Sequence, residues 1–155
     1  GAHGLRVTSS DRMAEYVGLG MERAAREGAS SVAWEVCDAL DLRAHRERGD
    51  VDLFLCTQAA HHFAPGLLVQ MIAQAIAAAR EGILIVDLSR AATTALGTAA
   101  VSAAVVPWPV LMYDGWQSVR RAYTPSEFEL LARMAGARHV AAKPFGPAWC
   151  AVHAR

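Results

Sequence analysis

The sequence has few cysteines and no motif that would pair them. Its three cysteines, Cys37, Cys56 and Cys150, all lie in apolar runs, and none has a Cys-x-x-Cys spacing. An odd count without such spacing argues against a disulfide framework and against a cysteine-based zinc site. We therefore expect reduced, buried thiols in a cytoplasmic protein.

The sequence also lacks a long hydrophobic run and an excess of charge of either sign. No apolar stretch reaches the roughly 18 residues of a membrane-spanning helix, and we expect no membrane contact. Fifteen Lys and Arg residues balance 15 Asp and Glu residues, so the formal net charge is zero. This balance gives no electrostatic reason to expect a nucleic acid as partner. It removes one barrier to self-association, so a homo-oligomer is compatible with the composition.

What the sequence does have is enough apolar material for one substantial core. Hydrophobic residues make up 54% of the 155 positions, which predicts a single domain over residues 1–155. The first four residues, "GAHG", include no Met. We expect this domain to be an N-terminally truncated portion of a longer chain.

Strand-like and helix-like segments alternate along most of the sequence. A capping box at Thr124–Glu127 with proline at the first helical position marks one helix start, and Gly28 and Gly136 mark two helix ends. Such alternation predicts an α/β fold with a Rossmann-like, mostly parallel sheet and helices on both faces. The short link between the last two strands predicts an antiparallel strand at the C-terminal edge. The expected strands are residues 5–8, 32–36, 51–56, 83–86, 139–143 and 149–153; the expected helices are 13–27, 65–80, 91–106 and 124–135; residues 38–50 and 110–123 are expected to be loops, the first with a helical turn.

Polar side chains follow the expected parallel strands, where an open sheet of this kind binds its ligands. Asp11, Asp38, Thr57–Gln58 and Asp87 each come at or just after the end of a strand. A carboxylate at such a position can bind the hydroxyls of a ribose. Each acid also has a purely structural interpretation, because Asp11 and Asp38 can cap a helix or turn and Asp87 can be a buried structural group.

The adjacent histidines His61 and His62 leave three interpretations open. A shared metal ion is disfavoured, because neighbouring histidines on a turn diverge and no Cys or acid lies at a ligand spacing, so we expect no metal. One histidine can serve as a general base or contact a substrate. Alternatively, one is a hydrogen-bonded scaffold residue and the other is turned to solvent or to the core.

Five segments in this order resemble the class I S-adenosylmethionine-dependent methyltransferases, and the resemblance covers almost the whole chain. "VTSSDRMAEYVGLGMERAAREG" resembles the family's second strand and following helix, and "VAWEVCDALDL" resembles its third-strand segment. "VDLFLCTQAAHHF" is similar to the fourth-strand motif, "GILIVDLSR" to the fifth strand, and "AYTPSEFELLARMAGARHV" to the last helix and sixth strand. The family's small-molecule branch fits best.

The resemblance implies S-adenosylmethionine as cofactor and assigns its contacts. Asp11 would bind the ribose hydroxyls and Asp38, with Ala39 beside it, the adenine. Thr57 and Gln58 would lie closest to the sulfonium.

The resemblance also suggests an acceptor side. His62 is the candidate base, His61, Tyr113 and Trp116 are candidate contacts to a small-molecule methyl acceptor, and an oxygen nucleophile is the expected acceptor atom. The aromatic residues have a structural alternative as lid packing.

One departure from the family is large. The first strand and its glycine-rich loop, E/D-x-G-x-G-x-G, should lie about twenty residues before Asp11 and are absent from this sequence. Without them a central strand position would be unpaired. The loop discriminates between the enzyme and a non-catalytic, methyltransferase-like subunit or scaffold. A nucleotide-sugar or NAD-binding Rossmann protein is a third hypothesis, which needs a G-x-G-x-x-G fingerprint that is also lacking.

Overall fold

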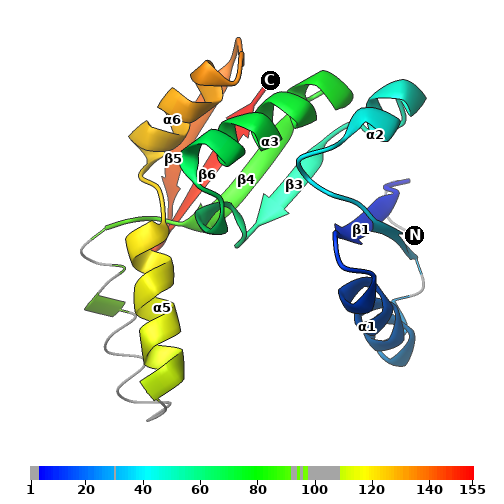
Figure 1. Ribbon diagram of the computed structural model, residues 1–155, viewed down its shortest axis with the longest axis horizontal. Helices are drawn as coiled ribbons and strands as arrows, with labels where there is room; N and C mark the ends of the chain where they lie inside the picture. The colour runs from blue at the N-terminus through cyan, green and yellow to red at the C-terminus, as the bar shows by residue number, and fades with distance from the viewer. Residues whose placement is uncertain (1–3, 30, 92–93, 95, 98–108) are drawn as a thin grey trace. The chain divides into compact units, whose positions relative to one another are not determined.

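The computed structural model describes residues 4–29, 31–91, 94, 96–97 and 109–155. For residues 109–112 it describes the backbone only. The chain divides into two compact units, Gly1–Leu42 and Arg43–Arg155, which we describe one at a time. Both units combine strands and helices (Figure 1). Within the described ranges, the apolar helices all fall short of what crossing a bilayer requires.

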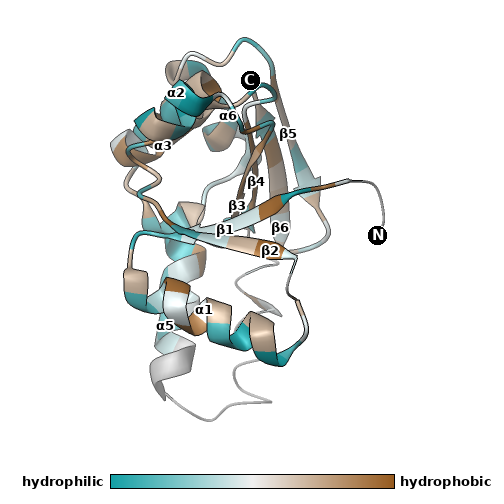
Figure 2. Ribbon diagram, turned by 90° about the vertical axis from the view of Figure 1, so that its right-hand side faces the viewer, coloured by the Kyte–Doolittle hydropathy of each residue, from teal (hydrophilic) through white to brown (hydrophobic). Residues whose placement is uncertain are grey.

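The first unit is a strand–helix–strand motif. Strands β1 (Val7–Asp11) and β2 (Val32–Val36) are parallel, with Val7 opposite Val32, and α1 (Ala14–Arg26) connects them. Hydrophobic and hydrophilic residues are interspersed along α1 (Figure 2). The expected helix and second strand are confirmed, whereas the first strand begins and ends later than expected and includes Asp11.

Helix α1 meets its sheet through a small residue. Val17 is the buried residue of the helix, and Gly20 lies one turn further on the same face. A Cβ atom on Gly20 would lie 2.2 Å from Cζ3 of Trp34 on β2, whereas a Cβ on Gly18 would meet nothing within 4 Å. Glycine at position 20 therefore lets the helix approach the indole ring.

The second unit contains a four-stranded sheet in the order β3-β4-β6-β5. The first two strands are parallel, and the last strand in the chain is antiparallel to both of its neighbours. An antiparallel last strand was expected at the edge, but β6 lies inside the sheet and β5 forms the edge. The expectation failed because it assumed that a hairpin adds its strands outward in chain order. The strands are β3 (Phe54–Thr57), β4 (Ile83–Leu88), β5 (Val140–Phe145) and β6 (Trp149–Ala154).

The core of the second unit lies between this sheet and two helices that pack against one face of it. Burial alternates along β4 and β6, so one face is enclosed and the other is partly exposed. The enclosing helices, α3 (Pro65–Ala78) and α6 (Pro125–Met134), contact each other as well as the sheet. Among the described helices of the second unit, α3 and α6 thus supply the cover of this face. The largest fully buried hydrophobic side chains include Leu68, Ile72, Ile85, Phe128 and Val152.

Helix α6 begins as the sequence predicts. The Thr124 hydroxyl accepts a hydrogen bond from the backbone N–H of Glu127, and the Glu127 carboxylate accepts one from the backbone N–H of Thr124. These bonds satisfy two backbone donors that a helix start leaves unpaired. The helix ends before Gly136, whose φ of +93° is the left-handed conformation that glycine adopts most easily.

One segment expected to be a loop in the second unit is a helix. Residues 110–123 were expected to form a loop, but Pro109–Arg121 form helix α5. Gln117 donates a hydrogen bond to the hydroxyl of Tyr113 one turn earlier, and this contact stabilises the helix. The glycine and aromatic residues of the segment had favoured a loop instead. The expected helix over 91–106 lies largely outside the described residues. Helix α2 (Arg43–Arg48) is the helical turn expected between residues 38 and 50.

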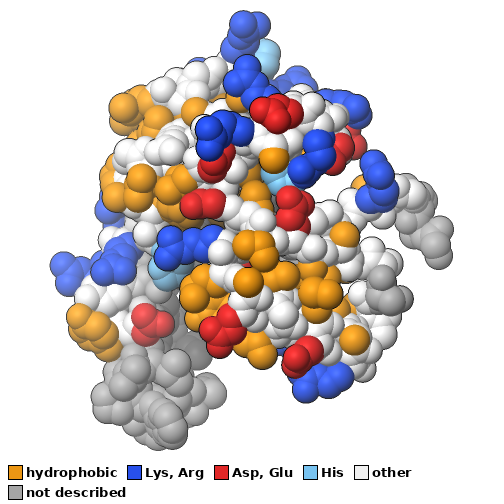
Figure 3. All heavy atoms as spheres, turned by 45° about the vertical axis from the view of Figure 1, so that its right-hand side comes forward, with side chains coloured by type: hydrophobic (Ala, Val, Ile, Leu, Met, Phe, Trp, Pro, Cys, Tyr) orange, Lys and Arg blue, Asp and Glu red, His pale blue; other side chains and the backbone are white. Residues whose placement is uncertain are grey.

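Strand β3 is less buried than expected. Its continuous apolar run predicts burial on both faces, yet Leu53 is 43% and Leu55 63% exposed. Within the described residues β3 pairs with β4 alone, and β1 pairs with β2 alone. Hydrophobic side chains (orange) reach the surface beside charged ones (Figure 3). The apolar run thus correctly predicts a strand here, but it does not predict how much of the strand is buried.

Candidate functional site

In the first unit, two aspartates lie at the same end of the parallel pair. Asp11 is the last residue of β1 and is opposite Val36, two residues before Asp38. Each carboxylate closes a local turn through its Oδ1: Asp11 accepts from the N–H of Met13 at 2.7 Å and Asp38 from that of Leu40 at 2.9 Å. The turn interpretation is therefore correct for Asp38, whereas Asp11 closes a turn without capping α1, whose N-cap is Met13. The turn bond is the same at both positions. It uses one oxygen of each carboxylate, and Ala39 lies within the turn that Asp38 closes.

In the second unit, β3 ends in an unusual backbone conformation. Thr57 is its last residue, and Gln58 follows with a φ of +53°, the left-handed region that non-glycine residues seldom adopt. The N–H of Gln58 still donates to the carbonyl of Val86 on β4 at 3.0 Å. Both side chains are exposed at the carboxyl end of the strand. A left-handed glutamine costs free energy that a glycine would not, so its presence points toward a role for its side chain.

Next to this strand end, a buried carboxylate holds the first histidine. Asp87, at the end of β4, is fully buried, and its Oδ1 lies 2.8 Å from Nδ1 of His61. Its Oδ2 accepts the backbone N–H of His61 at 2.8 Å, and Oδ1 also accepts the N–H of Leu88 at 2.7 Å. A carboxylate can only accept, so Nδ1 of His61 carries the proton and Nε2 presents its lone pair. Asp87 thus fixes both the turn and the tautomer of the ring.

The two histidines have different environments. His61 is 6% exposed, whereas His62 is exposed. Their ring centroids are 4.1 Å apart within the short helix η1 (Ala60–His62). His61 is therefore the buried, hydrogen-bonded histidine of the two, and His62 is the exposed one. No three His, Cys, Asp or Glu side chains gather as metal ligands anywhere in the described ranges.

Helix α5 carries the two aromatic candidates and packs against η1. Tyr113 is 65% and Trp116 47% exposed. Just beyond the helix, the Tyr123 hydroxyl donates to the carbonyl of Phe63 at 2.7 Å, which ties the end of α5 to the histidine turn. Burial raises the pKa of Tyr123, and the nearby Glu127 raises it further, so its hydroxyl remains a donor. The structure thus brings Thr57, Gln58, His61, His62 and α5 to one end of the second unit.

The cysteines of the second unit have raised thiol pKa values. Burial, with a smaller contribution from the charge of Asp87, raises the pKa of both Cys56 and Cys150 to about 11. Cys150 is fully buried, whereas Cys37 and Cys56 are half-buried, so the expected burial is complete for one thiol only. All three are free cysteines, as expected.

Sequence reasoning missed the contact between Asp87 and His61. It considered Asp87 as a strand-end acid and the histidines separately, because 26 residues separate the partners. The available signal was topological. Strands ending at Thr57 and Leu88 are neighbours in a parallel sheet, so the polar residues at their ends must lie side by side.

Comparison with solved structures identifies the fold. Human N-acetylserotonin methyltransferase, solved with S-adenosylmethionine, matches 98% of this chain and 41% of its own, with a TM-score of 0.65 and 19% identity. An O-methyltransferase family 2 protein from Planctomyces limnophilus, solved with apigenin, matches 97% of this chain and 42% of its own (TM-score 0.63, 18% identity). A methyltransferase from Aquifex aeolicus matches 96% of this chain and 68% of its own (TM-score 0.63, 15% identity). No protein-family model and no curated sequence matches.

These matches show that the chain has the fold of the class I S-adenosylmethionine-dependent methyltransferases. Identities of 13–19% across the similar structures support the fold alone. The chain spans 45% of a similar structure from Nostoc punctiforme, 41% of the human enzyme and 43% of the methyltransferase SibL, which is less than half of each. These matches therefore establish the fold of the chain and not the activity of the whole protein.

Proposed function

We propose that this chain serves S-adenosylmethionine-dependent methyl transfer to a small molecule, with an oxygen nucleophile as acceptor. The observation that carries the proposal is the Asp87–His61 pair at the carboxyl end of the sheet, in a methyltransferase fold. A histidine oriented by a buried carboxylate is suited to take a proton from a hydroxyl acceptor. The cofactor supplies an activated methyl group, so the protein has mainly to position the acceptor and remove its proton.

The cofactor-binding roles follow the resemblance and fit the chemistry of the side chains. Asp11 would bind the ribose hydroxyls and Asp38 the adenine amine, with Ala39 against the base. In each acid Oδ2 has no hydrogen-bond partner within the described residues and is open to a ligand. Thr57 and Gln58 would serve the sulfonium end, which gives a reason for the costly backbone of Gln58.

For the base, the sequence favours His62, whereas the hydrogen bonds favour His61. Asp87 orients the ring of His61 and stabilises the imidazolium that would form on proton transfer. His62 is more accessible, but no acid holds its ring within the described part of the chain. We therefore place the proton transfer at Nε2 of His61 and give His62 the role of an acceptor contact, together with Tyr113 and Trp116.

Calorimetry with S-adenosylhomocysteine tests the cofactor assignment. We expect Asp11→Ala to weaken binding at least about tenfold, because a charged hydrogen bond to a ribose contributes roughly 1.5–3 kcal/mol. Glu22→Ala is the matched control: it removes an exposed carboxylate from α1 in the same unit and should leave the affinity unchanged. The titration should use both this chain and the chain with any upstream residues that its gene encodes. Absence of binding in both would favour the non-catalytic scaffold.

Methyl-transfer kinetics with a phenol or alcohol acceptor test the base. We expect His61→Ala to lower kcat by about 10²–10⁴ and His62→Ala to act mainly on KM. Asp87→Asn, which keeps the shape of the side chain, should lower kcat, because the ring loses its oriented tautomer. A large loss of kcat in His62→Ala with an unchanged His61→Ala would return the base to His62.

A further inference from the structure

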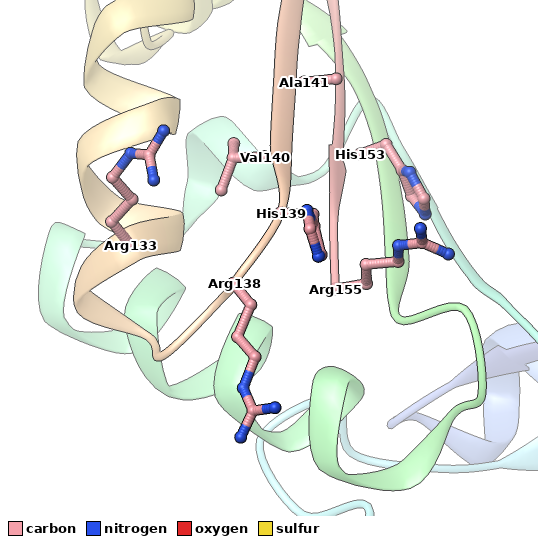
Figure 4. Close-up of a pocket in the computed structure, with 7 residues that line it drawn as sticks. All are labelled: Arg133, Arg138, His139, Val140, Ala141, His153 and Arg155. Atoms are coloured by element: carbon pink, nitrogen blue, oxygen red, sulfur yellow. The ribbon is translucent and has the colours of Figure 1, made fainter.

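The end of the sheet opposite the histidine pair carries a basic pocket. It has a volume of about 470 Å³ and is lined by Arg133, Arg138, His139, Val140, Ala141, His153 and Arg155. Figure 4 shows that these residues come from the end of α6, the link into β5 and the paired strands β5 and β6. Five of the seven can carry a positive charge, and none is acidic. This is a local excess of one charge on a chain whose formal net charge is zero.

The pocket is separate from the proposed methyl-transfer site. Val140 and Ile83, the first residues of β5 and β4, both pair with Ala154 near the end of β6. The pocket therefore lies where β4 begins, and Asp87 lies near where it ends. Four residues along a strand span about 13 Å at roughly 3.3 Å each, so a ligand at one end would not reach the other.

The backbone holds the basic side chains in fixed positions. The N–H groups of Arg138 and His139 both donate to the carbonyl of Arg155, at 2.8 and 2.9 Å, and the N–H of Arg155 donates back to His139 at 3.0 Å. His139 lies between Arg138 and Arg155 in the view of Figure 4. His153 is anchored through Nε2, which lies 2.7 Å from the carbonyl of Glu81. A ligand would therefore not have to order the main chain that carries these groups.

The charges of the pocket are only partly neutralised by the protein. Arg133 pairs with Glu129 and Arg155 with Glu81, each at 2.8 Å, and the side chains of both pairs are about half exposed. Exposed pairs of this kind contribute about 0–1 kcal/mol, so an anionic ligand can compete for the arginines. Arg138 forms no ion pair or side-chain hydrogen bond within the described residues. One guanidinium of the lining thus remains unpaired, and two are weakly paired.

We infer that this pocket, at the start of β5, binds a phosphate group, either as the free ion or as part of a phosphorylated small molecule. Guanidinium groups present N–H donors in a planar fork that matches the oxygens of a phosphate, and the dispersed positive charge suits an ion with about two negative charges. The imidazole of His139 can add a donor, whereas the Nε2–H of His153 is already bonded to the carbonyl of Glu81. Val140 and Ala141 are the apolar residues of the lining, and they lie on opposite faces of β5.

Titration of the whole chain at constant ionic strength, followed by backbone NMR, tests this inference. We expect inorganic phosphate or glycerol phosphate to bind saturably, with a Kd of about 1 mM or below, and to shift the amide signals of Arg138–Ala141, His153 and Arg155. Tighter binding of glycerol phosphate would assign the pocket to a phosphorylated molecule, and equal binding to the free ion.

Arg138→Gln should weaken binding at least about fivefold, as expected for the loss of a charged hydrogen bond at an exposed site. Since Arg138 is exposed and its side chain is unpaired, the variant should fold normally, which the unchanged remainder of its NMR spectrum would confirm. Arg46→Gln, which removes an exposed arginine of α2 in the same unit, is the charge-matched control and should bind as the parent does. Non-saturable shifts, or equal weakening in both variants, would overturn the inference. Neither result bears on methyl transfer, which is measured with other ligands at the other end of the sheet.

Discussion

The contact between Gly20 and Trp34 predicts opposite effects for the same substitution at two glycines of one helix. In Gly20→Ala, the new Cβ would lie 2.2 Å from Cζ3 and 2.4 Å from Cη2 of the indole, whereas ordinary contact begins at 3.4 Å. Either the helix or the ring must therefore move by about 1 Å, and overpacking of this kind costs about 1–3 kcal/mol. In Gly18→Ala, the new methyl group meets nothing within 4 Å.

Comparing the two variants isolates the steric effect. Alanine is favoured over glycine inside a helix by about 1 kcal/mol, so Gly18→Ala should stabilise the first unit by that amount. Gly20→Ala receives the same gain and the steric cost, which leaves a net loss of about 0–2 kcal/mol. The helix propensity cancels in the difference between the variants. The expected difference of about 1–3 kcal/mol is therefore the steric cost itself.

Hydrogen exchange measured by mass spectrometry is the suitable assay, because it reports α1 and β2 separately from the rest of the chain. A single melting curve would combine two compact units that need not unfold together. Peptides covering α1 should exchange more slowly than in the parent for Gly18→Ala and faster for Gly20→Ala. Equal protection in the two variants would show that the indole moves away without cost and that Gly20 is not required for the packing.

Three further predictions concern the second unit. Thr124→Ala removes the acceptor for the N–H of Glu127 and should lower the free energy of unfolding by about 1 kcal/mol in chemical denaturation. Cys56 and Cys150, whose pKa values are about 11, should react with iodoacetamide at pH 8 roughly a hundredfold more slowly than a free cysteine peptide. The same thiols lose their protons at a lower pH in the unfolded state than in the folded state. The free energy of unfolding should therefore fall as the pH rises from about 9 to 11. Gln58→Gly should raise the melting temperature slightly by removing a left-handed non-glycine residue, and it should weaken S-adenosylhomocysteine binding if the amide contacts the cofactor.

The parts of the fold that the sequence predicts correctly are those set by local chemistry. The capping box at Thr124, the glycine ends at Gly28 and Gly136, and the apolar spacing of α3 each define an element within a few residues of itself. Helix α5 was missed for the same reason: its glycine and aromatic residues favour a loop locally, and its packing against η1 is not visible in the sequence. The exposure of Leu55 was also unpredictable, because burial of a strand depends on what lies beside it.

The candidate site shows how a local and a distant role can belong to one side chain. Asp11 and Asp38 were each given two alternatives, a cap or a ligand for ribose or adenine, yet the turn bond occupies Oδ1 only. The structural role therefore does not compete with the ligand role; it fixes the carboxylate so that Oδ2 has a defined direction. His61 and Asp87 follow the same logic, since the bond at Nδ1 is what gives Nε2 its lone pair. Residue type and strand order predict where such groups lie, but which atom remains available for a ligand depends on hydrogen bonds between residues far apart in the chain.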